Sequence, residues 1–427
     1  MIANAIAKRV LSEVDQDELV QLALDLCDIN SISGNEQEIG NFILNWFEEN
    51  GFHPIRQVVE EDRCNAVGVL RGVGGGPSLT FNGHMDARIA VPSLAKSFER
   101  DGLLYGNEMA NMKAGLAAFL IGAKAISDAG VQLNGDLILA CVIGELSVGG
   151  VGRFQATQDR GEGIGTRHLI ANGIQSDYAV EADGSEYTII RAQAGVADFK
   201  LTTEGVSRYT PFTTRPKNIG KSENAIVKMV RVVDAIENWA VEYEKRNIYD
   251  LPDGRVTPKV CISKIEAGMP PVVEGEWRIA FKPSEQPALC DLYIDVRLAP
   301  GVSPVKVKHE LEELVYGLPF ECRVEMFRSQ KGYEAKGADV DYLSSIVGKA
   351  YENVYETKVP SGLQEPIISS MWTDTNLYWE AGITAVKWGP SDVGPYPDHK
   401  VAIIDKLFRA AKVYSLIALD ICGVATK

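Results

Sequence analysis

Side chains that bind metals or transfer protons follow the ends of several apolar runs in this sequence. His84 and Asp86 come after SLTFNG, Glu145 comes after DLILACVIG, Glu181 lies in DYAVEADG, and His399 follows TAVKWG and a short loop. Sites in α/β sheets collect at the carboxyl ends of strands, so residues that follow different strands meet at one edge. The pattern therefore predicts one shared site for a metal ion or for acid–base catalysis.

Asn111 lies at a critical point of the stretch GNEMANMKAGLAAF, residues 106–119. This stretch is expected to run from a loop into a helix, and its small residues allow the helix to approach a sheet closely. An acidic residue where the loop becomes the helix could hold a metal firmly, whereas an amide holds one weakly. Asn111 therefore indicates either a lost metal site or a site that uses metal in a different way.

Length and composition limit the class of protein. The chain has 427 residues, of which 45% are hydrophobic and 24% charged, and this length predicts two domains. A formal charge of −15 argues against nucleic acid as a partner. No apolar run is expected to cross a bilayer, the N-terminal segment does not resemble a signal peptide, and seven cysteines without a CxxC pair predict reduced thiols. We therefore expect a cytoplasmic protein without a membrane partner.

The first part of the chain alternates helical and extended segments. Apolar residues recur at helical spacing over 16–27 and 34–51, and short apolar runs bounded by turns predict strands at 65–70, 78–83, 136–144 and 177–182. This alternation predicts the α/β class, with a catalytic domain whose mixed sheet is flanked by helices.

The pattern of segments changes near residue 191. We expect, in order, a strand, a long helix, two strands, a helix and a strand, at 196–205, 222–245, 259–268, 289–299, 303–317 and 321–329. The order βαββαβ is that of a small four-stranded α+β domain with two helices. A helix at 339–355 and a strand at 382–389 then resume the first pattern. The sequence thus predicts an inserted domain at 191–330 within a catalytic domain formed by 1–190 and 331–427.

Taken together, these motifs resemble the zinc-dependent exopeptidases and amide hydrolases, a family that includes aminoacylases, glutamate carboxypeptidase and succinyl-diaminopimelate desuccinylase. NGHMDA is similar to the family's His-x-Asp strand end, and YGNEMANMKAGLAA to a segment that normally carries Asp before Met-Lys-Gly-Gly. GELSVGGVG is similar to a Glu-Glu segment, SDYAVEAD to a stretch that ends in a metal-binding acid, and DHK to the segment with the last histidine. The resemblance implies that the inserted domain is a lid and dimerisation module, and hence a homo-oligomer that is at least a dimer.

The resemblance also implies a set of metal ligands. Family members hold two metals that share a carboxylate, and one metal takes a histidine and an acid, here His84 and Glu181 with Asp183 as the alternative. Asn111 replaces the shared Asp in this chain, and Leu146 replaces the second Glu. Two dications about 3.5 Å apart repel by about 19 kcal/mol at an effective dielectric constant near 20, and the lost carboxylates no longer offset that repulsion. We therefore expect at most one ion of Mn, Zn, Co or Fe.

The catalytic positions of the family are retained. Asp86 can hold the far ring nitrogen of His84 and fix its tautomer, and Glu145 takes the position of the general base. The simpler alternatives are a turn-capping role for Asp86 and a solvated strand-end acid for Glu145. His399 has lost the metal-sharing acid, so it ligates the single metal, contacts the substrate or is an ordinary loop histidine.

Substrate contacts are expected from three further residues. The family carries a histidine in the lid that stabilises an oxyanion, and Tyr209 or Arg208 lies near that position in EGVSRYTPF. Arg297 in DVRLAPG matches an arginine that binds a substrate carboxylate in some relatives, and a guanidinium can pair with a carboxylate through two hydrogen bonds. Packing or salt-bridge roles are the alternatives for Tyr209 and Arg297. Asp183, if it is not the acid ligand, is also expected to contact substrate.

Three functions agree with these residues. The first is a metal-dependent hydrolase of a C–N bond in a small anionic substrate, and the depleted metal site resembles that of a divergent branch that deaminates 5-nitroanthranilate to 5-nitrosalicylate and ammonia. The second is a dipeptidase or an N-acyl amino acid amidohydrolase. The third is a non-catalytic family member with a binding role, which the retained histidines and acids disfavour.

Overall fold

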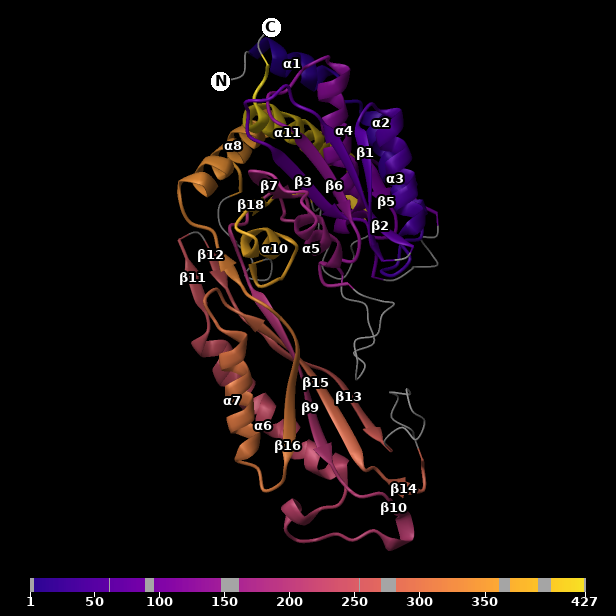
Figure 1. Ribbon diagram of the computed structural model, residues 1–427, viewed down its shortest axis with the longest axis vertical. Helices are drawn as coiled ribbons and strands as arrows, with labels where there is room; N and C mark the ends of the chain where they lie inside the picture. The colour runs from indigo at the N-terminus through magenta and orange to yellow at the C-terminus, as the bar shows by residue number, and fades with distance from the viewer. Residues whose placement is uncertain are drawn as a thin grey trace.

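Two separate sheets, one of six strands and one of four, organise the chain (Figure 1). The computed structural model describes residues 4–60, 62–88, 96–146, 161–252, 254–269, 282–360, 369–390 and 401–425. The six-stranded sheet and both chain termini lie in the upper half of Figure 1, and the four-stranded sheet lies in the lower half.

The six-stranded sheet has the order β1-β2-β6-β3-β7-β18. Its strands are β1 (His53–Glu60), β2 (Arg63–Leu70), β3 (Leu79–His84), β6 (Leu137–Val142), β7 (Tyr178–Glu181) and β18 (Thr384–Lys387). Strands β6, β3, β7 and β18 run parallel to one another, whereas β1 and β2 pair antiparallel and β2 pairs antiparallel with β6. The prediction of a mixed sheet is confirmed.

Helices cover both faces of this sheet because side chains alternate along each strand. In β6, Leu137 and Leu139 join one apolar cluster, whereas Ile138 and Ala140 join another on the opposite face. The first cluster also takes residues from α1 (Asn4–Ser12), α2 (Gln16–Asp28), α3 (Gln37–Glu49), α4 (Ala114–Asp128), α8 (Ala338–Tyr355) and α11 (Ile404–Cys422). The other face is covered by α5 (Ile164–Ala171) and α10 (Thr375–Glu380).

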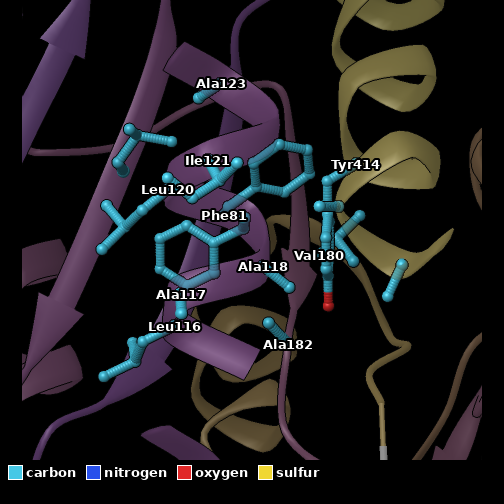
Figure 2. Packing of buried hydrophobic residues seen from close by; sticks show 14 of the residues in the cluster. Phe81, Leu116, Ala117, Ala118, Leu120, Ile121, Ala123, Val180, Ala182 and Tyr414 are labelled. Atoms are coloured by element: carbon cyan, nitrogen blue, oxygen red, sulfur yellow. The ribbon is translucent and has the colours of Figure 1, made fainter. Parts of the chain in front are cut away.

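Helix α4 is the most deeply buried of these helices and packs beside Phe81 and Tyr414, whose rings lie edge-to-face 5.0 Å apart (Figure 2). A Cβ atom added at Gly115 would lie only 2.8 Å from the carbonyl oxygen of Ala182, so the small residues do permit close packing on the sheet. The segment Met109–Asp128 is long and apolar enough to cross a membrane, contrary to the expectation that no apolar run would be. However, 89% of its apolar window is buried within the protein, as in a core helix.

The four-stranded sheet is wholly antiparallel and has the order β13-β15-β9-β16. Along the chain, its strands and the two helices between them are β9 (Gly195–Glu204), α6 (Ala225–Arg246), β13 (Val260–Gly268), β15 (Leu289–Leu298), α7 (Pro304–Tyr316) and β16 (Cys322–Gln330). Both helices contribute to its apolar cluster, through Val232 and Ile236 of α6 and Leu311 of α7. The βαββαβ order is confirmed, and the segment proposed as the inserted domain contains the whole sheet.

Shorter elements complete the described part of the chain. The helical turns are η2 (Met109–Lys113), η3 (Thr210–Phe212) and η4 (Ile219–Lys221). The short strands are β4 (Phe98–Arg100), β5 (Leu103–Tyr105), β8 (Ala192–Gln193), β10 (Arg208–Tyr209), β11 (Tyr249–Leu251), β12 (Gly254–Val256), β14 (Glu285–Gln286), β17 (Tyr333–Glu334) and β19 (Val401–Ile403). Strand β8 precedes the four-stranded sheet and β17 follows it, and the two pair with each other. The chain therefore enters and leaves the inserted segment at one place.

Candidate metal centre

The carboxyl ends of four strands converge at one edge of the six-stranded sheet. Strand β3 ends at His84, which lies opposite Val142 of β6, and Glu181 at the end of β7 lies opposite Asn82 of β3. On its other side Glu181 lies opposite Lys387, the last residue of β18. The parallel register therefore brings the chemically active residues of separate strands together.

His84 is at the centre of this cluster, and both of its ring nitrogens face oxygen atoms. Nδ1 lies 3.1 Å from the backbone carbonyl oxygen of Asp86 and 3.4 Å from its Oδ1. Nε2 lies 3.1 Å from Oδ1 of Asn111 and 4.0 Å from Oε2 of Glu145. If Nδ1 donates its hydrogen to Asp86, the lone pair on Nε2 faces two oxygen atoms. That arrangement is favourable only with a proton or a metal cation between the atoms.

The electrostatic surroundings of His84 favour such a cation. Burial opposes a charge on the ring, but the hydrogen bond with Asp86 and the carboxylates of Glu145, Asp86 and Asp183 outweigh it, and they raise the pKa of His84 well above its ordinary value. A divalent ion can replace the proton on Nε2, because a neutral imidazole nitrogen is a metal ligand.

Asp86 connects the histidine to the loop that carries Glu145. Its Oδ1 accepts a hydrogen bond of 3.0 Å from the backbone N–H of Glu145, and its Oδ2 accepts one of 3.0 Å from the N–H of Leu146 and one of 2.5 Å from the hydroxyl of Ser33. Burial raises the pKa of Asp86, yet the bond with His84 and these donors lower it overall. Asp86 is thus an ionised anchor that fixes Glu145 relative to His84.

Glu145 itself is buried, and its surroundings favour the protonated carboxyl group. Burial raises its pKa well above the ordinary range, and the negative charges of Asp374, Asp183 and Glu181 raise it further, while His84 partly offsets them. A carboxyl group whose pKa is raised is a stronger base than an ordinary carboxylate and can return the proton that it takes. The environment of Glu145 therefore suits general acid–base chemistry.

The two candidate acid ligands differ in what they contact. Both oxygens of Glu181 are engaged at the start of α10: Oε1 accepts from the N–H of Asp374 at 3.0 Å, and Oε2 accepts from the hydroxyls of Thr373 and Thr375. Asp183 accepts a hydrogen bond of 2.7 Å from Gly184 N–H on Oδ1 and pairs through Oδ2 with the ammonium of Lys387. Asp183 thus has fewer protein donors than Glu181.

Two other sequence-predicted residues, Tyr209 and Arg297, are not part of this cluster in the described structure. His399 lies outside the described residues. Tyr209 is 54% exposed and contacts the ring of Phe212 on β10 and η3, at the end of the inserted segment remote from β3 (Figure 1). Arg297 lies on β15 and donates to Oδ2 of Asp295 at 2.8 Å. Within one chain the structure therefore does not bring Tyr209 to His84.

Two buried charged residues near the cluster were not singled out from the sequence. Lys387 is fully buried, and Asp374 is 1% exposed. Asp374 accepts a 2.5 Å hydrogen bond from the hydroxyl of Thr166, and burial together with the charge of Glu181 raises its pKa to about 8. The only sequence indication was a lysine directly after the apolar run TAV and an acid within the polar run TDTN.

The described residues place a small set of metal-binding atoms around His84. Within the described residues, no three His, Cys, Asp or Glu side chains are grouped as a metal site. His84 and Asn111 nonetheless present a nitrogen and an oxygen to the same point, with Asp183 close enough to act on the charge of His84. Leu146, at the position of a second acid, offers only its backbone N–H to Asp86.

Comparison with known families gives the assignment. Residues 80–420 match peptidase family M20/M25/M40. The chain belongs to this family. Peptidase family M20/M25/M40 comprises metal-dependent hydrolases, so the predictions of family, of a divalent metal and of hydrolysis at C–N bonds are confirmed at that level.

Individual M20 relatives are similar over nearly their whole length. N-formyl-4-amino-5-aminomethyl-2-methylpyrimidine deformylase from Bacillus subtilis is 26% identical over 444 residues, which cover 96% of each chain. The aminopeptidase PepT structure from Bacillus cereus superposes with a TM-score of 0.68 at 17% identity, covering 96% of this chain and 99% of that one. The Bacillus subtilis YXEP protein, described as a dinuclear metal binding peptidase, has a TM-score of 0.61 at 14% identity, with coverage of 95% and 98%. The two structures establish the shared fold.

Proposed function

We propose that this M20 protein uses a single divalent ion to hydrolyse a C–N bond in a small anionic substrate. The observation that carries the proposal is the approach of Asn111 Oδ1 and Glu145 Oε2 to the same nitrogen of His84, at 3.1 and 4.0 Å. His84, Asn111 and Asp183 are the proposed ligands, with His399 as a further candidate. When bound, the ion supplies Lewis acidity that polarises water and substrate.

Glu145 performs the proton transfers in this proposal. It takes a proton from the attacking water while the C–O bond forms, and it returns that proton to the nitrogen while the C–N bond breaks. Asp86 keeps His84 in one tautomer and holds the backbone of Glu145. Glu181 is assigned a structural role, because its oxygens already accept hydrogen bonds from Thr373, Asp374 and Thr375.

Two substrate classes are compatible with the proposed site, and the relatives bear only on the second. In the first, 5-nitroanthranilate is deaminated to 5-nitrosalicylate and ammonia; the nitro group accepts charge during attack on the ring, and protonated Glu145 supplies the departing ammonia with a proton. In the second, an amide is cleaved in a substrate that need not be anionic, and the 26% identity to a deformylase over 96% of the chain favours a formamide on a small heteroaromatic compound over a peptide.

A product assay separates these classes. The metal-loaded enzyme is incubated with 5-nitroanthranilate, with an N-formyl aminomethylpyrimidine and with a dipeptide panel, and ammonia, formate and amino acids are measured. Release of ammonia alone supports deamination, and release of formate or amino acids supports amide hydrolysis. If none of the compounds reacts while metal binding persists, the assigned substrate class is wrong.

Metal stoichiometry tests the one-ion site independently of substrate. Chelator-treated protein is titrated with Mn²⁺ or Zn²⁺ by calorimetry, and one ion per chain is expected. Two ions would contradict the reading of Asn111 and Leu146, and no binding would favour a non-catalytic role. The double change Asn111→Asp with Leu146→Glu restores both acids and is expected to raise the number of bound ions.

We also propose self-association through the inserted segment, to at least a dimer. Val227 and Val230 on α6 expose 41% and 56% of their surface, and apolar residues that are exposed together on one helix favour contact with another protein surface. Light scattering of the purified chain measures the mass; a monomer at micromolar concentration would contradict the proposal.

A further inference from the structure

We propose that the ammonium of Lys387 is a built-in cation of the metal centre. In this inference it gives the carboxylates part of the positive charge that a second ion supplies in a dinuclear relative, and it thereby limits the site to one divalent ion. The inference rests on the proposed one-ion hydrolase and names the residue that makes a second ion unfavourable.

The position of Lys387 places its charge inside the centre. Its Cα lies opposite that of Glu181 in the parallel pair of β18 and β7, and its side chain is fully buried. The ammonium pairs with Oδ2 of Asp183, the proposed acid ligand. Its charge acts on Asp183 most strongly, then on Glu181 and on Glu145. Lys387 therefore pairs with the acid that would otherwise be free to hold the metal.

The negative charge of the cluster favours a cation at this position. Five carboxyl groups gather around the strand ends. Those of Asp86, Glu145, Glu181 and Asp374 are buried, and that of Asp183 is partly buried. Buried carboxylates are stable only when they are paired, hydrogen-bonded or protonated. In a dinuclear site, two ions meet this need. Here an ammonium and one ion can meet it, together with protons on the acids whose ionisation burial disfavours.

The backbone around Lys387 keeps its side chain in the centre. A Cβ atom added at Gly389 would lie 2.1 Å from the carbonyl oxygen of Ala182 and 2.5 Å from that of Asp183, so the chain after β18 is pressed against the chain after β7. The N–H of Trp388 donates to the carbonyl of Glu181 at 2.9 Å. Lys387 and Asp183 are thus held side by side by main-chain contacts.

The test is a metal titration of Lys387→Met beside the wild type, each stripped with chelator and titrated with Mn²⁺. Removal of the ammonium frees Asp183 and removes a like charge, so the dissociation constant for the ion should fall at least tenfold. Lys200→Met is the matched control, since Lys200 is also largely buried and pairs with a carboxylate, Glu325 at 2.7 Å, but in the inserted segment. Its affinity for Mn²⁺ should stay within twofold of wild type.

A second variant protects the test against misfolding. Lys387→Gln keeps a hydrogen-bond donor for Asp183 without the charge, and it should also bind Mn²⁺ at least tenfold more tightly. In the background of Asn111→Asp with Leu146→Glu, adding Lys387→Met should tighten the second ion at least tenfold.

The outcomes separate the two proposals. One ion in the wild type with unchanged affinity in both Lys387 variants would overturn the role of Lys387 and leave the one-ion site standing. Two ions in the wild type, or none, would overturn the one-ion function itself. If Lys387 were purely structural, its replacement would lower the melting temperature without changing the affinity for Mn²⁺. That result would also overturn the proposed role of Lys387.

Discussion

Glu145 is the single residue whose replacement should reduce turnover most. Glu145→Gln keeps the size of the side chain and removes its ability to carry a proton, so we expect kcat to fall by about 10²- to 10⁴-fold. Metal affinity should change little, because Glu145 is not a proposed ligand. Steady-state kinetics and a Mn²⁺ titration measure both quantities. Glu310→Gln on α7 is the control and should keep wild-type kcat; equal loss in both variants would contradict the assignment.

Asp86 should act on metal affinity through His84 rather than through the substrate. Asp86→Asn weakens the contact with Nδ1 and also disturbs the N–H donors of Glu145 and Leu146, so we expect the dissociation constant for Mn²⁺ to rise about 10- to 100-fold. Ser33→Ala removes only one donor to the same carboxylate and should have a smaller effect. An unchanged affinity in Asp86→Asn would show that the tautomer of His84 is fixed in another way.

The sequence made these residues recognisable because each follows an apolar run directly. His84, Asp86 and Glu145 could be placed at strand ends by that rule alone. Lys387 could not, since a lysine at the end of a strand is most often solvated, and only the pairing of β18 with β7 reveals that it is buried beside Asp183. Roles that depend on which strands become neighbours are not visible in one sequence.

At the scale of elements, the contact between β7 and the start of α10 fixes Glu181, the acid that the sequence predicted as a metal ligand. Thr375→Val keeps the shape of the side chain and removes a hydroxyl that donates to the buried Glu181. A lost hydrogen bond to a charged group costs about 1.5–3 kcal/mol, and we expect that decrease in the free energy of unfolding by denaturant titration. In a Glu181→Gln background the same change should cost less; an equal cost would contradict a direct interaction.

The close approach of β18 to β7 provides a second test at this scale. Gly389→Ala places a Cβ atom 2.1 Å from the carbonyl oxygen of Ala182, so the backbone must shift. Overpacking of this kind costs about 1–3 kcal/mol, and the shift should also displace Asp183 and weaken Mn²⁺ binding. Gly317→Ala after α7 is the control, because its nearest neighbour is 3.5 Å away. Wild-type stability in Gly389→Ala would show that the two segments separate easily.

Long elements with clear periodicity were predictable, and short ones were not. The expected helix at 222–245 and strand at 289–299 agree with α6 and β15 to within a few residues. Helix α10 has only six residues and no apolar repeat long enough to detect, yet it supplies donors to Glu181. Its place is set by packing of Leu377 and Tyr378 against β7 and β18, a long-range interaction.

At the scale of the whole molecule, one arginine connects the inserted segment to the catalytic part. Arg328 on β16 lies with Nε 3.1 Å from Oε2 of Glu162, which precedes α5, and with Nη1 3.4 Å from Oδ2 of Asp198 on β9. Its guanidinium also lies over the ring of Trp372, 5.3 Å from the centroid. These contacts connect the inserted segment to the catalytic part of the chain. The orientation of the inserted segment therefore depends on the buried ion pairs of Arg328.

Asp198 makes that junction sensitive to pH. Burial, together with the charges of Asp295 and Glu162, raises its pKa to about 6, even though Arg328 offsets part of the effect. Between about pH 4 and 6 the folded state therefore binds more protons at Asp198 than the unfolded state, so its contribution to stability falls as pH rises and is fully unfavourable above pH 6. The rise of the pKa from 3.8 to about 6 corresponds to at most about 3 kcal/mol.

Asp198→Asn should accordingly stabilise the protein at neutral pH and leave it nearly unchanged in acid. Arg328 still pairs with Glu162 in this variant. Because the cost of ionising Asp198 is removed, we expect a gain of about 1–3 kcal/mol in the free energy of unfolding at pH 7.5. Near pH 4 the folded aspartic acid is neutral and the unfolded one is about half ionised, so the difference should shrink to a small part of its value at pH 7.5. Denaturant unfolding of both proteins at steps between pH 4 and pH 8 measures this curve. A difference that does not vary with pH would mean that Asp198 is ionised without cost beside Arg328, and that the junction is held by packing around Trp372 instead.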